Sequence, residues 1–177
     1  MTQIDTPRLT LLAFSLAQLE TYTSSLPDLS KELGFPLLGD PNQPAVARAI
    51  RLKMEIMRPL SESNRLWVTY WLIILRQERI GAGLLGFKGQ PDALGQVEIG
   101  YGINEAHQNK GYMTEAVRAL SHWALQQPGC NLITAEIYNG NAASIRVQQK
   151  LGASLSSRDE EKSIYQLKRA QRTSSAA

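Results

Sequence analysis

Apolar residues in the N-terminal half of the chain predict one strand and two helices. Residues 8–13 form a short apolar run that predicts a strand, and Ser15 is suited to cap a helix over 15–24. A second helix is predicted over 42–58, because apolar residues recur there at helical spacing. They are Ala45, Ala49, Leu52 and Ile56. The Pro- and Gly-rich residues 34–44 are expected to form the loop between the two helical stretches.

The rest of the chain shows strand-like runs separated by helical patterns. Residues 66–75 and 80–87 are joined by a polar turn and predict a β-hairpin. Further strands are predicted over 97–103, 132–138 and 164–167, and helices over 112–127 and 142–151. Asn141 is suited to cap the last helix and Gly152 to end it.

These elements predict an α/β fold on a mixed sheet. An antiparallel first half is followed by strand–helix–strand–helix–strand order. The chain has 177 residues, against the ~150 of a typical domain, and shows no internal repeat. We therefore expect one domain over residues 1–169. The small, polar residues 170–177 are expected to form a flexible tail.

Composition argues against several classes of protein. With 43% hydrophobic and 20% charged residues, the chain matches neither disordered nor fibrous proteins. No apolar run reaches the ~18 residues of a membrane span, and residues 1–8 lack the apolar core of a secretory signal. Cys130 is the only cysteine, which excludes an intrachain disulfide and argues against a Cys/His metal cluster. We expect no metal, no membrane partner and a cytoplasmic setting.

The charge balance is mildly basic and carries little information on its own. The net charge of +3 suits an anionic ligand. Because the basic residues are dispersed rather than gathered with aromatic residues, direct binding of nucleic acid is not expected. A small basic protein associated with RNA stays an alternative, which a steep salt dependence of RNA binding would support. An edge strand near either terminus would also allow a homodimer.

The segment 80–86 contains a formal GxGxxG pattern. A dinucleotide site needs these glycines between a strand and a helix. Here they lie within the predicted strand, and Lys88-Gly89-Gln90-Pro91 follows instead of a helix. We interpret the pattern as a glycine-rich strand that a neighbouring segment approaches closely.

Residues 108–113 lie where a predicted strand leads into the start of a helix. The first N–H groups of a helix lack intrahelical partners and carry the positive end of its dipole, so they favour anions. Gly111 allows close approach of phosphate oxygens, and Lys110 adds positive charge. An ordinary loop leading into a helix would show the same residues.

The strand 97–103 presents two different faces. Ile99, Tyr101 and Ile103 share one face, whereas Glu98, Gly100 and Gly102 share the other. Two glycines beside one carboxylate leave an open slot that would admit an extended ligand. A closely packed helix would fit the same pattern, and Glu98 would then be an ordinary surface residue. Further on, Asn141 and Ser144 open the last helix, as cap residues or as groups aimed at the same slot.

Taken together, these segments resemble the GNAT family of acyl-CoA-dependent N-acetyltransferases. The family signature [RQ]-x-x-G-x-[GA] matches Gln108 and Gly111, with Met113 at its last position. The stretch from Asn141 to Gly152 is similar to the second half of the family's acetyl-CoA region. Thr6-Pro7-Arg8-Leu9 looks like the opening of the RimJ/RimL-type branch, which acetylates the N-termini of ribosomal proteins.

The resemblance implies a central, mostly antiparallel sheet flanked by helices, in which two parallel strands splay apart. Acetyl-CoA would enter the gap between 97–103 and 132–138. Gly102 and Ile103 would line its pantetheine arm, Asn141 would bond that arm, and Ser144 would lie near the thiol. The pyrophosphate would be held by the loop and helix start, that is by Gln108, Asn109, Lys110, Gly111, Tyr112, Met113 and Thr114.

The resemblance further implies transfer of the acetyl group, in a ternary complex, to a primary amine of a protein N-terminus or a small molecule. Free amines are largely protonated at neutral pH, so a proton acceptor is needed, for which Glu98 is the candidate. Gln148 stands where many members have a tyrosine that protonates the departing thiolate, which leaves this role to Ser144 or to water. The alternative is an acetyl-CoA-binding sensor or partner module without catalysis.

Overall fold

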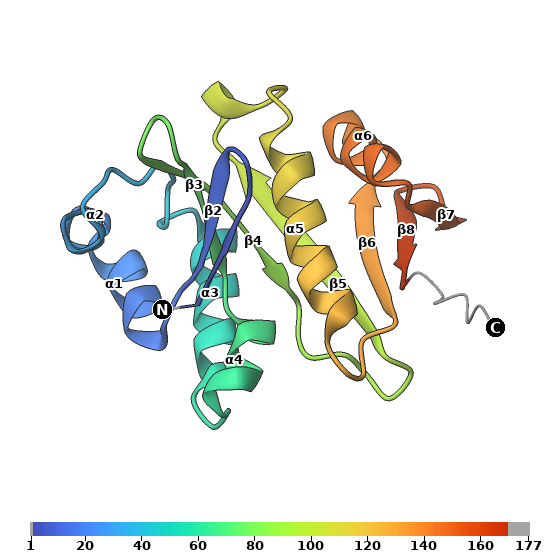
Figure 1. Cartoon of the computed structure of the whole chain (residues 1–177), viewed down its shortest axis with the longest axis horizontal. Coiled ribbons are helices and arrows are strands. Elements are labelled where there is room, and N and C mark those ends of the chain that lie inside the picture. Colours follow the sequence, from blue (N-terminus) through green and yellow to red (C-terminus); the bar gives the residue numbers. More distant parts are fainter. Residues whose placement is uncertain (1, 170–177) are drawn as a thin grey trace, which may run out of the picture.

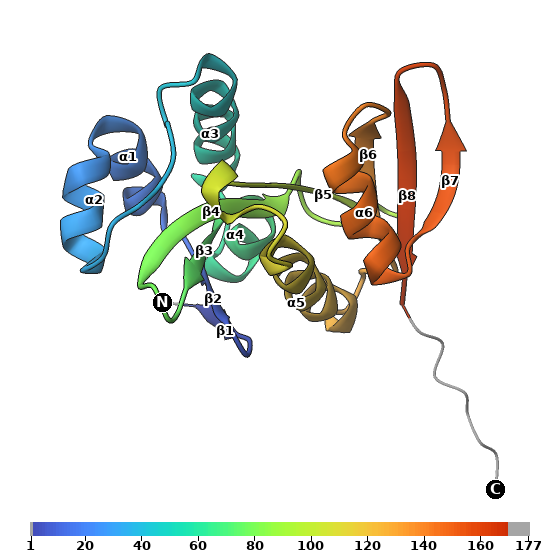
Figure 2. The same ribbon diagram turned by 90° about the horizontal axis from the view of Figure 1, so that it is seen from above.

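The sheet runs through the whole molecule and carries helices on both faces (Figures 1 and 2). The computed structural model describes residues 2–169, and the tail expected over 170–177 lies outside the described residues. The strands are β1 (Gln3–Asp5), β2 (Leu9–Ala13), β3 (Trp71–Leu75), β4 (Ile80–Phe87), β5 (Gln96–Ile103), β6 (Leu132–Tyr138), β7 (Ser154–Arg158) and β8 (Lys162–Lys168). Their order across the sheet is β1-β2-β3-β4-β5-β6-β8-β7.

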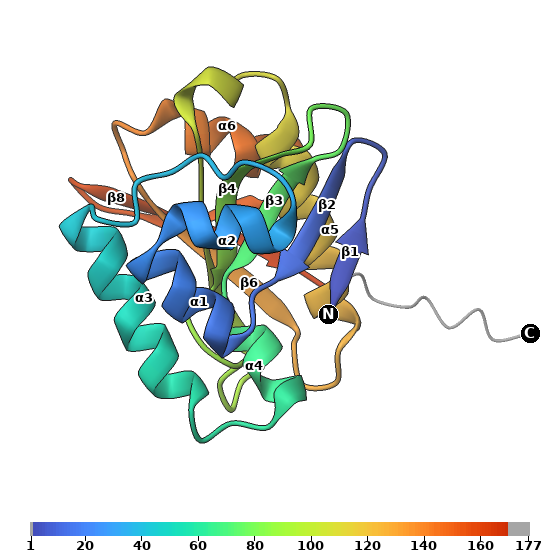
Figure 3. The same cartoon turned by 90° about the vertical axis from the view of Figure 1, so that its left-hand side faces the viewer.

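The helices fill the connections between these strands. They are α1 (Leu16–Ser24), α2 (Leu26–Leu33), α3 (Pro44–Met57), α4 (Glu62–Val68), α5 (Tyr112–Gln126) and α6 (Ala142–Leu151), with a 3₁₀ turn over Glu105–His107. Figure 2 shows α3 on one face of the sheet and α5 and α6 on the other. Figure 3 shows α1, α2 and α3 grouped on the same side of the molecule. None of the helices within residues 2–169 has the length and apolar character to cross a membrane.

The pair β5–β6 is parallel, whereas the other strand pairs of the described chain are antiparallel. The two strands pair only at Gln96–Leu132, Val97–Ile133 and Glu98–Thr134. Beyond these positions β5 continues along β4 as far as Ile103, and β6 continues along β8 as far as Tyr138. The expected mixed sheet with a splayed parallel pair is therefore confirmed.

Most of the predicted elements are present, but the predicted strand 66–75 is wrong at its start. Residues Glu62–Val68 form α4, and only Trp71–Leu75 are extended. A short apolar run cannot be assigned to helix or strand by periodicity alone. Here tertiary bonds favour the helix: the Arg65 guanidinium donates to the Met57 carbonyl (3.0 Å), and the Trp71 indole donates to the Leu66 carbonyl (3.1 Å).

Helix α3 has the predicted period but buries a different face. Leu52 and Ile56, expected to face the core, are 57% and 40% exposed. The buried stripe instead contains Ile50 and Met57, both fully buried. Two neighbouring stripes of this helix are apolar, and the sheet covers only one of them, so the sequence of the helix alone does not decide between them.

The glycine-rich strand β4 is closely approached by its neighbours, as interpreted from the sequence. A Cβ atom on Gly81 would overlap the Leu37 side chain, and one on Gly83 would overlap the Gly102 carbonyl oxygen of β5. A Cβ on Gly86 would lie 2.6 Å from the Thr69 carbonyl oxygen. The glycines therefore allow close packing of β4 against β5, the Leu37 side chain and the backbone just before β3.

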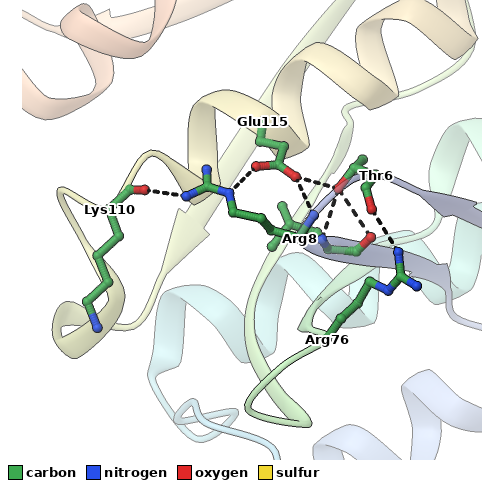
Figure 4. A network of polar contacts seen from close by, with 6 residues as sticks. Thr6, Arg8, Arg76, Lys110 and Glu115 are labelled. Carbon is green, nitrogen blue, oxygen red and sulfur yellow. Dashed lines mark hydrogen bonds and ion pairs between the residues drawn. The ribbon is translucent and has the colours of Figure 1, made fainter.

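A polar network joins the N-terminal segment to the start of α5 (Figure 4). The Arg8 guanidinium donates to the Lys110 carbonyl (2.9 Å) and forms an ion pair with Glu115 (2.6 Å). The Thr6 hydroxyl and the Arg8 N–H also donate to the Glu115 carboxylate, at 2.7 and 2.9 Å. The guanidinium lies 4.7 Å from the centre of the Tyr112 ring. These contacts fix the position of the loop that leads into α5.

The close packing at Gly86 predicts a loss of stability in Gly86→Ala. Because the added methyl group meets a backbone carbonyl, we expect the free energy of unfolding to fall by about 1–3 kcal/mol. Urea unfolding measures the change. Gly89→Ala is the matched control, since its Cβ meets nothing within 4 Å, and its effect should stay within about 0.5 kcal/mol. Equal stability of the two variants would contradict the tight contact.

The Glu115 network predicts a pH-dependent contribution to stability. Burial alone would raise the pKa of Glu115, but the hydrogen bonds from Thr6 and Arg8 outweigh it and hold the pKa below its usual range. The ionised carboxylate therefore stabilises the fold above its unfolded-state pKa of about 4.3, and this contribution is lost as the pH falls through the lower folded-state pKa.

We expect the difference in unfolding free energy between wild type and Glu115→Gln to be largest above about pH 5 and to shrink below about pH 4. Urea unfolding at a series of pH values measures it. Glu55→Gln, at an exposed position of α3, serves as the control. A difference that does not vary with pH would rule out the assigned role of the carboxylate.

Candidate active site

A first cavity of about 300 Å³ lies between the end of β5, the start of α5 and the start of α6. The structure brings most of the predicted binding residues to its wall. These are Gly102, Ile103, Gln108, Asn109, Gly111, Tyr112, Met113, Thr114, Asn141 and Ser144. Lys110 and Glu98 do not line it. The Lys110 carbonyl instead accepts the hydrogen bond from Arg8.

The start of α5 gives this cavity a positive electrostatic character. Gly111 caps the helix in the left-handed conformation, with φ of 81°, and no side chain bonds the helix start. Counted from the start of the helix, the Glu115 N–H is the first to bond, to the Gly111 carbonyl (3.1 Å). The N–H groups of residues 112–114 lie before it and have no intrahelical acceptor. These groups and the dipole of a four-turn helix favour a negatively charged ligand.

Helix α6 forms the opposite wall and adds two cationic residues that the sequence analysis missed. The Asn141 side chain accepts from the Ser144 N–H (3.0 Å) and so caps α6. Arg146 and Lys150 line the cavity. They are four residues apart and share a helix face with Ala143 and Val147, so helical spacing from Ala143 onward was the signal that could have found them.

Gln148 is buried and supports a tyrosine of β5. Its side chain is 3% exposed, and its amide donates to the Tyr101 hydroxyl (2.9 Å). The Tyr101 hydroxyl in turn lies 3.3 Å from the Ser144 carbonyl oxygen, to which it donates. Burial raises the pKa of Tyr101, and these hydrogen bonds reduce the shift. The Tyr101 phenol of β5 therefore lies beside Ser144 and is bonded by Gln148 of α6.

His107 places an unpartnered polar atom at the first cavity. The residue is 7% exposed and lines the cavity, and its Nε2 atom lies 3.0 Å from the Glu78 carboxylate. Its Nδ1 atom is buried and has no hydrogen-bond partner among residues 2–169. Buried polar atoms are almost always bonded, so this atom is an exception, and its burial keeps it out of reach of a ligand in the cavity.

A second cavity, of about 490 Å³, lies on the other face of the sheet, between α3 and β3, β4 and β5. Gly100 and Gly102 form part of its floor, and a Cβ on either would meet nothing within 4 Å. Open space beside these glycines is therefore present, but Glu98, Asn141 and Ser144, which were expected at the same slot, do not line this cavity. Asn141 and Ser144 line the first cavity instead, and Glu98 lines neither. Lys88 lines the second cavity, and its ammonium forms an ion pair with Glu98 at 2.5 Å.

The two cavities share one stretch of backbone. Tyr101, Gly102 and Ile103 line both of them, at the end of β5 that has separated from β6. A ligand in the first cavity and a ligand in the second would therefore meet along this stretch. Within residues 2–169, no three His, Cys, Asp or Glu side chains are grouped so that they could hold a metal ion.

Comparisons with known proteins agree with this arrangement. A family profile described as an acetyltransferase (GNAT) domain matches residues 8–154. The chain is 30% identical over 152 residues to the uncharacterized N-acetyltransferase YjdG of Bacillus subtilis (strain 168), covering 86% of this chain and 89% of that protein.

Solved structures of low sequence identity share the fold. RimL, a ribosomal L7/L12 alpha-N-protein acetyltransferase in complex with coenzyme A, superposes with a TM-score of 0.68 at 16% identity, covering 94% of this chain and 98% of that chain. The ribosomal-protein-S5-alanine acetyltransferase of Vibrio fischeri gives 0.68 at 14% identity, covering 96% and 97%.

The profile spans most of the chain, and YjdG matches along nearly its whole length. Together they confirm the resemblance inferred from the loop before α5 and the start of α6. The chain belongs to the GNAT family and is an acetyl-CoA-dependent N-acetyltransferase.

Proposed function

We propose that the protein transfers the acetyl group of acetyl-CoA directly to a primary amine, with both substrates bound at the same time. The observation that carries this proposal is that the two cavities meet along Tyr101, Gly102 and Ile103. The first cavity is the donor site and the second is the acceptor site. Bound acetyl-CoA supplies an acetyl thioester, and the protein's own groups bind, orient and move protons around it.

The residues of the first cavity fit the chemistry of the donor. The N–H groups at the start of α5 and the cations of Arg146 and Lys150 match a pyrophosphate. Beyond Glu98, the β6-facing side of β5 has no strand partner, so its backbone is free to bond the amides of a pantetheine arm.

Glu98 takes the proton of the acceptor amine, directly or through one water. It shares its face of β5 with Gly100 and Gly102, at the end of the open slot. Its carboxylate forms an ion pair with the Lys88 ammonium at 2.5 Å. The amine then forms its bond to the acetyl carbon as the bond to sulfur breaks.

The departing thiolate lies near the start of α6. Ser144 lines the first cavity there, and its hydroxyl donates a hydrogen bond to the sulfur. The Tyr101 phenol is held beside it by Gln148, which orders this wall of the donor site. A thiolate is a good leaving group, so stabilisation by hydrogen bonds suffices without a strong acid.

Two classes of acceptor are compatible with the second cavity, an α-amine of a protein N-terminus and a small-molecule amine. The fold is shared with RimL and with a ribosomal-protein-S5-alanine acetyltransferase, both described as acting on ribosomal proteins. These likenesses favour testing N-terminal peptides beside small amines. A reducing, cytoplasmic setting is part of the proposal, since the single cysteine, Cys130, is buried and free.

The donor site predicts that acetyl-CoA binding depends on Gly111. Gly111→Val places a β-branched residue at a left-handed position and displaces the loop that faces the pyrophosphate. We expect the affinity for acetyl-CoA to fall at least tenfold in isothermal titration. Gly129→Val is the control, because Gly129 has φ of 82° but lies far from the cavity, and it should bind within about twofold of wild type.

Binding of acetyl-CoA at one site per chain supports the donor assignment. No binding at millimolar acetyl-CoA by the folded wild-type protein would contradict it. Binding without turnover on any amine would favour the alternative of a sensor or partner module, for which the glutamine at position 148 is the motivating observation.

The acceptor site predicts that turnover depends on Glu98. In Glu98→Gln we expect turnover to fall by about 10²-fold or more, with acetyl-CoA affinity unchanged, because the variant lacks only the proton acceptor. Release of free CoA thiol measures turnover. Glu136→Gln is the informative comparison: Glu136 lies across the gap on β6 and is paired with Lys162 at 2.7 Å. If Glu136→Gln loses turnover and Glu98→Gln does not, the proton acceptor is Glu136 of β6 and not Glu98.

A further inference from the structure

Lys53 is a lysine in the buried stripe of α3. It follows Val46 and Ile50 and precedes Met57 at helical spacing, and the side chains of Ile50 and Met57 are fully buried. Lysine is almost never buried unless it is paired. At a position among apolar residues, its ammonium group therefore needs polar partners.

The ammonium group of Lys53 has two backbone partners and no carboxylate. Its Nζ atom donates to the carbonyls of Val68 (2.6 Å) and Phe87 (2.5 Å) and lies 4.6 Å from the centre of the Tyr70 ring. No Asp or Glu among residues 2–169 lies within ion-pair distance of it. An ammonium has three N–H donors, so two carbonyls leave one donor and the whole positive charge uncompensated.

Lys53 lines the second cavity, the proposed acceptor site. The other charged residues of the cavity wall are Asp40 and Lys88. Lys88 is neutralised by Glu98, and the Asp40 carboxylate accepts from the Asn42 N–H at 2.9 Å at an exposed position. The remaining wall is largely apolar, with Val46, Leu72 and Phe87 among its residues. Lys53 is therefore the unneutralised cation of this site.

Burial lowers the pKa of Lys53 to about 8, so the group is still mainly protonated at neutral pH. In a cavity with apolar walls, its attraction for an anion exceeds the attraction of a surface lysine. A second cation placed nearby is repelled to a similar degree. The hydrogen bond to Val68 also satisfies a carbonyl at the end of α4, so Lys53 has a structural contact in any case.

We propose that Lys53 selects an acceptor amine that also carries an anionic group, such as a carboxylate close to the amine. The proposal rests on the proposed function, because it treats the second cavity as the acceptor site. The amine nitrogen lies toward the slot beside Glu98, and the anionic group lies against Lys53. Polyamines and other polycationic acceptors are disfavoured. The carboxylate comes from a free amino acid or from an acidic residue near a protein N-terminus.

Matched acceptor pairs test the proposal and separate the two sources. One arm compares L-serine with L-serinamide, and the other compares the peptide amides Ser-Asp-Ala and Ser-Asn-Ala. In wild-type protein with saturating acetyl-CoA, we expect kcat/KM to favour the carboxylate member at least tenfold in one arm. In Lys53→Gln, whose amide keeps donors but loses the charge, the ratio should fall to about twofold or less.

The control removes one positive charge from the same helix without touching the cavity. Arg51→Gln, at an exposed position two residues away, should keep the wild-type ratio. A wild-type ratio below about twofold in both arms overturns the proposal, and so does a ratio that Lys53→Gln leaves unchanged. Circular dichroism shows whether Lys53→Gln folds. If it does not, Lys53→Arg takes its place and should preserve the ratio, and a wild-type ratio below about twofold in both arms still overturns the proposal.

A binding measurement keeps this proposal separate from the proposed function. Titration of N-acetyl-L-serine and N-acetyl-L-serinamide needs no turnover, and wild type should bind the carboxylate at least tenfold more tightly. That result without turnover on any amine would retain the anion site and reject the enzyme mechanism. Turnover on amines with equal binding of the two compounds would reject the role of Lys53 and retain the mechanism.

Discussion

The separation of β5 from β6 after three paired positions is the feature on which the site depends. Had the two strands stayed paired, the N–H and C=O groups of residues 99–103 on the β6 side would be bonded within the sheet. Because they diverge, β5 keeps its ladder with β4 and presents a free edge in the middle of the molecule. A free edge in a sheet interior needs hydrogen-bond partners, and an extended ligand with amide groups can supply them in the manner of an added strand.

Charge is distributed over the two faces of this edge in different ways. On the face of α5 and α6, backbone N–H groups, Arg146 and Lys150 converge without a carboxylate among the residues that line the cavity. Arg8 is not part of that wall, but it orients the loop through the Lys110 carbonyl while Glu115 balances its charge. On the face of α3, Lys88 is paired with Glu98, and the cation without a carboxylate partner is the Lys53 ammonium. The first arrangement suits a multiply charged phosphate group, and the second suits one small anion.

The order and type of most elements followed from the sequence. The helix over 112–127, for example, buries one apolar face, because its apolar residues recur at helical spacing. The positions on which the acceptor site depends were harder to find. Leu52 and Ile56 made an equally apolar stripe on α3, so the lysine in the true stripe went unnoticed. The end of the helix 62–68 overlaps the apolar run that was predicted as a strand over 66–75, and the helix is held by Arg65 and Trp71 contacts that no local pattern contains. The segments assigned to the proposed donor site were easier to find, because glycine spacing, helix caps and alternation are local properties and because these segments resemble the GNAT family.

The glycines of β4 and β5 connect the fold to its chemistry. Gly83 faces the Gly102 carbonyl so closely that a side chain there would push β4 away from β5. Gly100 and Gly102, in contrast, face open space, and side chains at these positions would fit the fold but fill the slot. The same residue type is thus required by packing on one strand, whereas on the next it borders open space. It follows that substitutions in β4 should act mainly through stability, whereas substitutions at Gly100 and Gly102 should act mainly through substrate access, although the residues lie on neighbouring strands.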